Sequence, residues 1–293
     1  MLIDTHAHLY WDSFKEDLDE VIQRALDSGV TTIINVGVDV EKSKEALRQT
    51  QEKLDSIPGL NTYSTIGIHP HEALNYAQPG QMSSGRGTNV HEDIAELERI
   101  YNSDPEKIVA VGECGLDFSS TSEEPELTSE VFIQKKLFQA QIDLAKKLNL
   151  PLIVHCRDDR SKDPQNSECW NEVIDMTKNH FGIYHCYSGL EQTTKQIIEE
   201  TNFLISFAAS ITYPKNEYLR EAAKLIPLDR IVLETDCPFL PPQSKRGQRN
   251  EPTAVAEIAQ LIADLKEMSL EEVVNQTTKN ATKKLIIDSL SYL

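Results

Sequence analysis

Short apolar runs alternate along this chain with longer segments whose apolar residues recur at helical spacing. The apolar runs predict strands over 2–8, 31–36, 63–69, 108–113, 151–155, 182–185, 203–207 and 230–236. The amphipathic segments predict helices near 13–28, 41–54, 91–103, 129–148, 190–200, 216–225, 253–267 and 269–288. Strands that alternate with helices are typical of parallel βαβ units. Eight such strands predict a (β/α)8 TIM barrel that fills the 293 residues as a single domain.

Two segments depart from this pattern. Residues 75–90 are rich in Gly, Ser and Pro, and we expect a loop insertion there, with a mobile loop over the barrel mouth as the alternative. Residues 119–128 form a second, acidic and Ser-rich loop.

The composition is that of a soluble globular protein, because 39% hydrophobic and 26% charged residues supply a full core. The chain has no run approaching the ~20 apolar residues of a membrane span. Its N-terminus carries aspartate where a secretory signal would carry basic residues. We therefore expect a cytoplasmic protein, with the nucleus as the open alternative, and no membrane partner.

The five cysteines are an odd number without zinc-finger spacing, which argues against a disulfide framework. Cys156 and Cys186 each follow a histidine at the end of a predicted strand. Because neighbours on a strand face opposite ways, we expect both thiols to pack outward under helices, with metal ligation by one of them as the alternative.

Two histidines end the first predicted strand. His6 and His8 are two positions apart, so their imidazoles point into one space, with Asp4 on the same face behind them. A pair of histidines at a frayed terminus is the simpler interpretation. Further metal-ligating side chains, however, recur at the ends of later strands, where the active site of a barrel lies. The full candidate set is His6, His8, Glu113, His155, His185 and Asp236.

The order of strands divides these ligands between two metal ions. Strands one and eight are neighbours in a closed barrel, so His6, His8 and Asp236 can share one ion. Strands five and six are also neighbours, so His155 and His185 can share a second, with Glu113 between them. Two divalent ions (Zn, Mg or Mn) about 3.5–4 Å apart suit hydrolysis, and Asp236 is also placed to accept the proton of the attacking water. An ion pair or a helix cap is the structural alternative for each carboxylate.

A series of motifs resembles the TatD family of metal-dependent deoxyribonucleases over nearly the whole chain. The motifs are Asp4-Thr5-His6-Ala7-His8, Gly67-Ile68-His69-Pro70, Gly112-Glu113-Cys114-Gly115-Leu116-Asp117, Val154-His155-Cys156-Arg157, His185-Cys186-Tyr187-Ser188-Gly189, Glu234-Thr235-Asp236-Cys237-Pro238-Phe239-Leu240 and Arg249-Asn250-Glu251-Pro252. The resemblance implies a TIM barrel with two divalent ions that hydrolyses DNA phosphodiesters, with 3′-to-5′ exonuclease activity typical of members. It supports the metal roles of all six candidate ligands, among which Glu113 and Asp236 are the catalytic candidates. The sequence departs from the family in its two loops and in Cys114, where an apolar residue is usual.

Three further residues are candidates for binding substrate. His69 ends the third strand and either contacts a phosphate or is a hydrogen-bonded structural histidine. Arg157 lies two positions past His155, on the same face if the strand continues, and we expect a phosphate contact rather than a surface ion pair. Arg249 precedes a predicted helix whose free amides favour an anion.

The charge of the chain limits how it can hold DNA. With 47 acidic and 29 basic residues, the net charge is -18, which argues against a broad nucleic-acid-binding surface. We therefore expect local contacts to a single-stranded or frayed 3′ end, made by a protein for which a monomer is favoured.

Three other functions stay open. An amidohydrolase that cleaves a cyclic amide often bridges its metals with a carbamylated lysine, but the fourth strand ends in Glu113, with Lys107 at its opposite end. Removal of an aminoacyl group from tRNA is a variant within the family. A barrel that binds nucleic acid or protein without chemistry is the third, and it leaves the ligand set unexplained.

Overall fold

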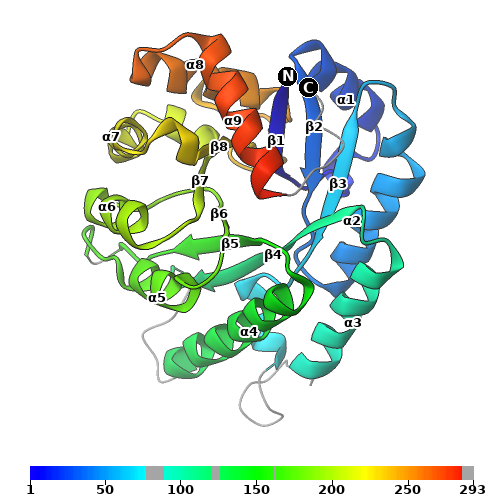
Figure 1. The fold of residues 1–293 in the computed structure, drawn as a ribbon, viewed down its shortest axis with the longest axis vertical. Coiled ribbons are helices and arrows are strands. Elements are labelled where there is room, and N and C mark those ends of the chain that lie inside the picture. The colour runs from blue at the N-terminus through cyan, green and yellow to red at the C-terminus, as the bar shows by residue number, and fades with distance from the viewer. Residues whose placement is uncertain (77–88, 120–125, 162, 286–293) are drawn as a thin grey trace.

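The computed structural model describes residues 1–76, 89–119, 126–161 and 163–285. Eight parallel strands form one sheet in the order β1 to β8. The strands are β1 (Leu2–Ala7), β2 (Val30–Asn35), β3 (Asn61–Ile66), β4 (Ile108–Asp117), β5 (Leu152–Arg157), β6 (Gly182–Tyr184), β7 (Leu204–Phe207) and β8 (Ile231–Leu233). Figure 1 shows them as a ring surrounded by helices. The predicted TIM barrel is confirmed.

The barrel is nearly closed between its first and last strands. Beyond the end of β8, the Asp236 amide donates to the His6 carbonyl (2.8 Å) and the His8 amide donates to the Cys237 carbonyl (2.9 Å). Ala7 and Cys237 form an isolated parallel bridge. These bonds bring the segment after β8 against the end of β1, so that side chains from the two ends of the sequence meet.

The helices are α1 (Leu18–Asp27), α2 (Val40–Glu52), α3 (Val90–Ser103), α4 (Glu126–Leu148), α5 (Glu168–Thr177), α6 (Glu191–Glu200), α7 (Glu217–Leu225), α8 (Ala254–Lys266) and α9 (Leu270–Lys284). Helix α5 was not predicted, although Cys169, Trp170, Val173 and Ile174 bury one face of it. Helix α4 begins earlier than predicted, inside the expected 119–128 loop. Most of the expected 75–90 insertion and the end of the 269–288 helix lie outside the described residues.

Alternation along the strands divides the core into two layers. Inward side chains such as Ile34, Ile153 and Ile183 fill the barrel. Outward side chains such as Ile33 and Tyr184 pack under the helices. Burial of this apolar surface is the main stabilising contribution to such a fold.

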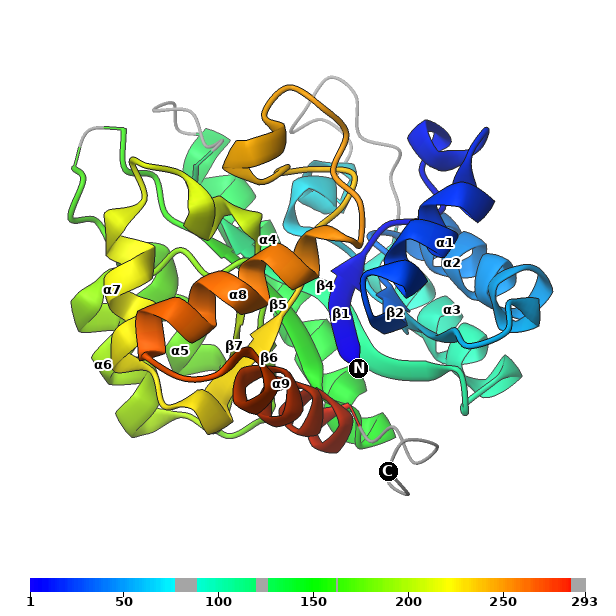
Figure 2. The same cartoon turned by 90° about the horizontal axis from the view of Figure 1, so that it is seen from above.

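Helix α9 closes the N-terminal end of the barrel. Its Ala281, with Leu285 just past the helix, joins the inner core layer, and Thr278 donates to the Met1 carbonyl (2.8 Å). Ser269 begins the helix with a capping box to Glu272. Figure 2 shows α9 and the N-terminus at one end of the barrel and the segment that joins β8 to α8 at the other. The C-terminal ends of the strands are therefore the end that is available for a site.

The regular alternation assumed for the first strand is interrupted. The register of β1 against β2 shifts between Asp4 and Ala7. Asp4 is fully buried and accepts hydrogen bonds from the Thr235 amide (2.9 Å) and hydroxyl (2.5 Å). The expectation that Asp4 lies behind His6 and His8 on the same face is corrected: Asp4 fastens β1 to the segment after β8.

None of the helices in the part of the chain that the structure describes combines the length and apolar character needed to span a bilayer. A cytoplasmic location stays a prediction.

Candidate metal centre

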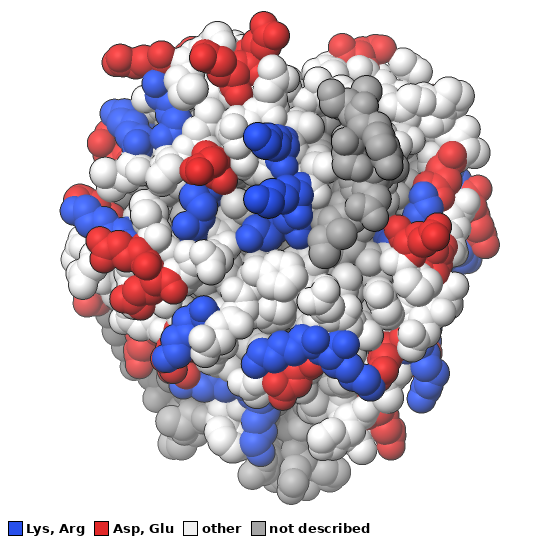
Figure 3. Space-filling view, viewed as in Figure 1, with Lys and Arg blue, Asp and Glu red and all other residues white. Residues whose placement is uncertain are grey.

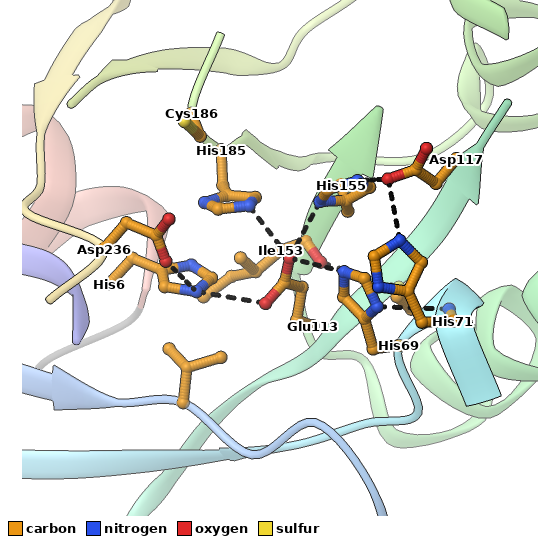
Figure 4. Close-up of polar contacts among 12 residues, drawn as sticks. His6, His69, His71, Glu113, Asp117, Ile153, His155, His185, Cys186 and Asp236 are labelled. Atoms are coloured by element: carbon orange, nitrogen blue, oxygen red, sulfur yellow. Dashed lines mark hydrogen bonds and ion pairs between the residues drawn. The ribbon is translucent and has the colours of Figure 1, made fainter. Parts of the chain in front are cut away.

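The structure brings the six predicted ligands together at the C-terminal ends of the strands, and Figure 4 labels all of them except His8. His6 lies on β1, Glu113 on β4 and His155 on β5, whereas His8, His185 and Asp236 lie just beyond the ends of β1, β6 and β8. Their side chains come from strands far apart in the sequence. Only closure of the barrel makes them neighbours.

Glu113 lies at the centre of the cluster, and its two carboxylate oxygens face different histidines. Oε2 is 3.2 Å from Nε2 of His6 and 3.8 Å from Nε2 of His8. Oε1 is 2.9 Å from Nε2 of His185 and 3.0 Å from Nδ1 of His155. The carboxylate therefore contacts both predicted groups of ligands. The two groups also touch each other, because the His185 ring stacks on the His6 ring (3.9 Å between centroids) and His6, His185 and Asp236 form a candidate group of their own.

Asp236 completes the first group. Its Oδ1 lies 3.4 Å from Nε2 of His8 and 3.8 Å from Nε2 of His6. The residue has a left-handed backbone (φ 56°), which Asp adopts more readily than most residues. Its side chain is 15% exposed, against 0% and 3% for the two histidines, so its carboxylate reaches the pocket.

His69 lies closer to the centre than its predicted substrate role required. Its Nε2 is 3.3 Å from Oε1 of Glu113, and His69, Glu113 and His155 form a third candidate group of ligands. Burial lowers the pKa of His69 to about 4, so its imidazole is neutral at pH 7. A substrate contact by His69 stays a prediction, in competition with a ligand role.

In three of the histidines, the ring nitrogen that faces away from Glu113 has a hydrogen-bond partner. The other ring nitrogen of each is left to bind metal. Nδ1 of His8 donates to the Val36 carbonyl (2.8 Å). Nδ1 of His185 lies 3.0 Å from the Glu234 carboxylate, and Nε2 of His155 lies 2.9 Å from the Asp117 carboxylate. Such outer partners fix the tautomer of metal-binding histidines. The residues therefore fit divalent metal ions, on the evidence of their hydrogen bonds as well as their chemistry.

Glu234 and Asp117 were missed as functional residues. Glu234 also accepts from the Cys186 amide (2.6 Å), which fixes the turn after His185. Burial alone would raise the pKa of Asp117, but hydrogen bonds from His155 and His71 hold that pKa well below its usual range. Both acids belong to quoted motifs, two residues before Asp236 and four after Glu113, and this spacing was the available signal.

A pocket of about 710 Å³ opens above the centre. Arg157 is the last residue of β5 and lines this pocket, as expected if the strand continued. The Arg157 side chain is exposed, and among the described residues nothing forms an ion pair or hydrogen bond with it. Lys215, which the sequence did not single out, also lines the pocket, is exposed and has no carboxylate partner in the described ranges.

Arg249 lies in a network of carboxylates. Its guanidinium contacts both oxygens of Asp17 (2.7 and 2.6 Å) and one of Glu251 (2.9 Å), and it covers the Phe14 ring at 4.6 Å. Arg249 is not part of the pocket lining. A phosphate contact by Arg249 stays a prediction, in which the phosphate would have to compete with these carboxylates.

The two cysteines beside ligands differ. Cys156 is buried with its Sγ 3.6 Å from Sγ of Cys169 on α5, which confirms its outward packing. Both residues border the pocket, but Cys186 is only partly buried and is not among the residues of the core under the helices, so the prediction of outward packing is wrong for this residue. Strand β6 ends at Tyr184, and the positive φ of Cys186 (44°) breaks the alternation.

Comparison with known proteins identifies the family of this chain. Residues 3–285 match the family model described as TatD related DNase. The chain belongs to the TatD family. It is therefore a metal-dependent hydrolase, and the predicted resemblance and enzyme class are confirmed.

Individual relatives resemble the chain over nearly its whole length. It is 37% identical over 288 residues to the uncharacterized metal-dependent hydrolase YabD of Bacillus subtilis (strain 168), covering 97% of this chain and 98% of YabD. It is 31% identical to the 3′-5′ ssDNA/RNA exonuclease TatD of Erwinia tasmaniensis, covering 96% and 98% of the two chains. The crystal structure of YJJV, a TatD homologue from Escherichia coli K12, superposes with a TM-score of 0.77 at 25% identity, covering 97% of each chain.

Proposed function

We propose that this TatD protein uses two divalent ions to remove nucleotides from the 3′ end of single-stranded nucleic acid. The observation that carries the proposal is the division of ligands by Glu113, whose oxygens face His6 and His8 on one side and His155 and His185 on the other. The similarity to the Erwinia protein named as a 3′-5′ ssDNA/RNA exonuclease supports the substrate class.

The residues of the centre divide the chemistry between them. A bound pair of divalent ions would supply an acidified water and neutralise charge on the phosphate. The Asp236 carboxylate reaches the pocket and accepts the proton of the attacking water. Arg157 donates hydrogen bonds to phosphate oxygens and orients the phosphodiester. Zn, Mg and Mn are the candidate ions.

A panel of substrates separates this function from its rivals. We would assay single-stranded DNA, nucleoside monophosphates, dihydroorotate and an aminoacyl-tRNA, each with and without added divalent metal. Metal-dependent release of mononucleotides from single strands supports the proposal. Hydrolysis of dihydroorotate or of the tRNA ester, with DNA left intact, would replace it with an amidohydrolase or a deacylase.

The size and charge of the site predict how much nucleic acid it holds. A pocket of about 710 Å³ is of the size that takes a small ligand, and only Arg157 and Lys215 add basic side chains to its described lining. On the opposite face of the barrel, acidic and basic side chains are interspersed (Figure 3). A net charge of -18 makes a long electrostatic groove unfavourable. The enzyme should therefore hold a few nucleotides at one strand end.

We expect linear single strands to be cut faster than blunt duplex and closed circles to resist, because a circle offers no end to the pocket. The salt dependence should be shallow, since each neutralised phosphate of a single strand contributes a slope of about -0.7. Initial rates on the three substrates across a salt series measure both effects. Rapid nicking of circles, or a slope equivalent to six or more phosphates, would contradict the exonuclease proposal.

Replacement of Arg157 tests the phosphate contact. Because Arg157 lies outside the ligand cluster, Arg157→Ala should weaken binding or turnover on DNA without loss of metal. Steady-state kinetics together with metal analysis measure the two effects. Arg48→Ala, at an exposed position on α2, is the matched control. Wild-type kinetics for Arg157→Ala would remove the arginine from this role.

A further inference from the structure

Two exposed aromatic side chains stand at the rim of the pocket. Trp11 is 37% exposed and Phe239 is 45% exposed, and both line the pocket above the metal centre. Trp11 follows β1 and Phe239 follows β8, so two loops from the ends of the sequence bring them together. Their rings meet edge to face, with centroids 5.7 Å apart. The remaining large exposed hydrophobic side chains of the described residues do not line this pocket.

The pair is held in place beside the first group of ligands. The Phe239 ring lies 6.1 Å from the ring of His8, and the backbone amide of Phe239 donates to the Asp236 carbonyl (2.9 Å). Trp11 stacks against Tyr10 (6.2 Å, 23° between planes), and the Lys42 ammonium lies 5.8 Å from its ring. These contacts fix the two rings before any ligand arrives. Exposed apolar surface that is fixed at a pocket rim is a feature of binding sites.

The positive charge of the pocket lies elsewhere in its wall. Arg157 ends β5, four strands away from β1 in the barrel, and Lys215 lies in the loop between η4 (Ala209–Thr212) and α7. A ligand that spans the site therefore meets flat aromatic surface beside β1 and β8, the Arg157 cation across the barrel at the end of β5, and the Lys215 cation in the loop after β7. Of the parts of a nucleotide, the base has a π-face and the backbone has the negative charge.

We propose that Trp11 and Phe239 form a nucleobase site, in which the base next to the scissile phosphate stacks on this aromatic pair while Arg157 and Lys215 hold the adjoining backbone. The inference rests on the proposed nuclease function and specifies how its substrate is recognised. Because every base has a π-face, the site accepts all four bases, and purines bind more tightly than pyrimidines because they offer more stacking surface.

The two tryptophans of the chain allow a binding test that does not depend on catalysis. Trp170 is fully buried between Tyr184 and Tyr187, so Trp11 reports on the pocket. Titration of the metal-loaded protein with deoxyadenosine monophosphate should quench tryptophan fluorescence, and the base-free 2-deoxyribose 5-phosphate should not. Phe239→Leu should raise the dissociation constant, Phe239→Tyr should restore it, and Trp11→Phe should abolish the signal.

Kinetics on matched oligonucleotides test the same site during turnover. One single strand ends in a normal 3′ nucleotide and the other in an abasic one. We expect Trp11→Leu and Phe239→Leu to raise KM on the normal strand by roughly 5- to 140-fold, the range for one stacked base. On the abasic strand they should change little. Phe132→Leu removes an exposed aromatic ring on α4, outside the pocket, and should match wild type on both strands.

The outcomes separate this inference from the proposed function. If wild type cuts oligonucleotides but shows no quenching by the nucleotide, and Phe239→Leu leaves KM unchanged, the base site is wrong and the nuclease function stands. If the nucleotide quenches Trp11 but no oligonucleotide is cut, the base site stands and the nuclease function fails. Equal KM values of wild type for normal and abasic ends would also overturn the base site.

Discussion

Glu113→Ala should release more than one metal ion per chain and lower turnover by orders of magnitude. The Glu113 carboxylate contributes an oxygen to each group of ligands, 3.2 Å from His6 and 2.9 Å from His185. Loss of its charge therefore weakens both halves of the centre at once. The loss of metal affinity and turnover should exceed the roughly 10- to 100-fold loss caused by removing a residue that only hydrogen-bonds to a metal ligand.

The measurement is metal content by mass spectrometry alongside kinetics, with circular dichroism to verify the fold. Glu199→Ala, at an exposed position on α6, is the matched control and should keep its metal. Two ions still bound to Glu113→Ala would remove this residue from the bridging role. Loss of one ion with the other half intact would make Glu113 a ligand of one ion only.

The fifth strand illustrates what the sequence could predict. Its register against β4 is continuous from Val154 to Arg157, so strict alternation holds. Ile153 therefore joins the inner core, while His155 and Arg157 reach the pocket, as their spacing indicated. Alternation accounts for His155, and closure of the barrel brings the six candidate ligands together, although His8, His185 and Asp236 lie just beyond the ends of their strands. Metal binding by them stays a prediction.

Local breaks and distant partners could not be predicted in this way. The register of β1 shifts beside Asp4, which bonds to Thr235, and Cys186 has a positive φ and borders the pocket. Neither break has a periodic signature. Lys215 and Trp11 lie in loops, whose paths depend on tertiary packing rather than on local pattern.

The missed helix has a different cause. Helix α5 spans only 10 residues and includes Asn, Asp and Thr, which are weak helix formers. Its stability comes from burying Cys169 and Trp170 against the barrel. Stabilisation by such burial can be inferred from the sequence only once the strands on either side of the helix have been located.

Asp236→Asn should lower turnover by about 10²- to 10⁴-fold, the usual contribution of a positioned general base. The amide keeps the shape of the side chain and one oxygen near Nε2 of His8, where the carboxylate lies 3.4 Å away. It cannot accept the proton of the attacking water. Because His155 and His185 also contact Oε1 of Glu113, we expect the metal held by that half to remain bound.

Turnover and metal content must be measured together, because they distinguish the two roles of Asp236. Asp175→Asn, on the exposed face of α5, is the matched control. A large loss of turnover with both ions retained supports the proton-accepting role. Turnover close to wild type would assign the proton to another group. Loss of turnover in proportion to loss of metal would make Asp236 a ligand alone. In that case, activity that returns in excess divalent ion would identify the weakened metal site as the one formed with His6 and His8.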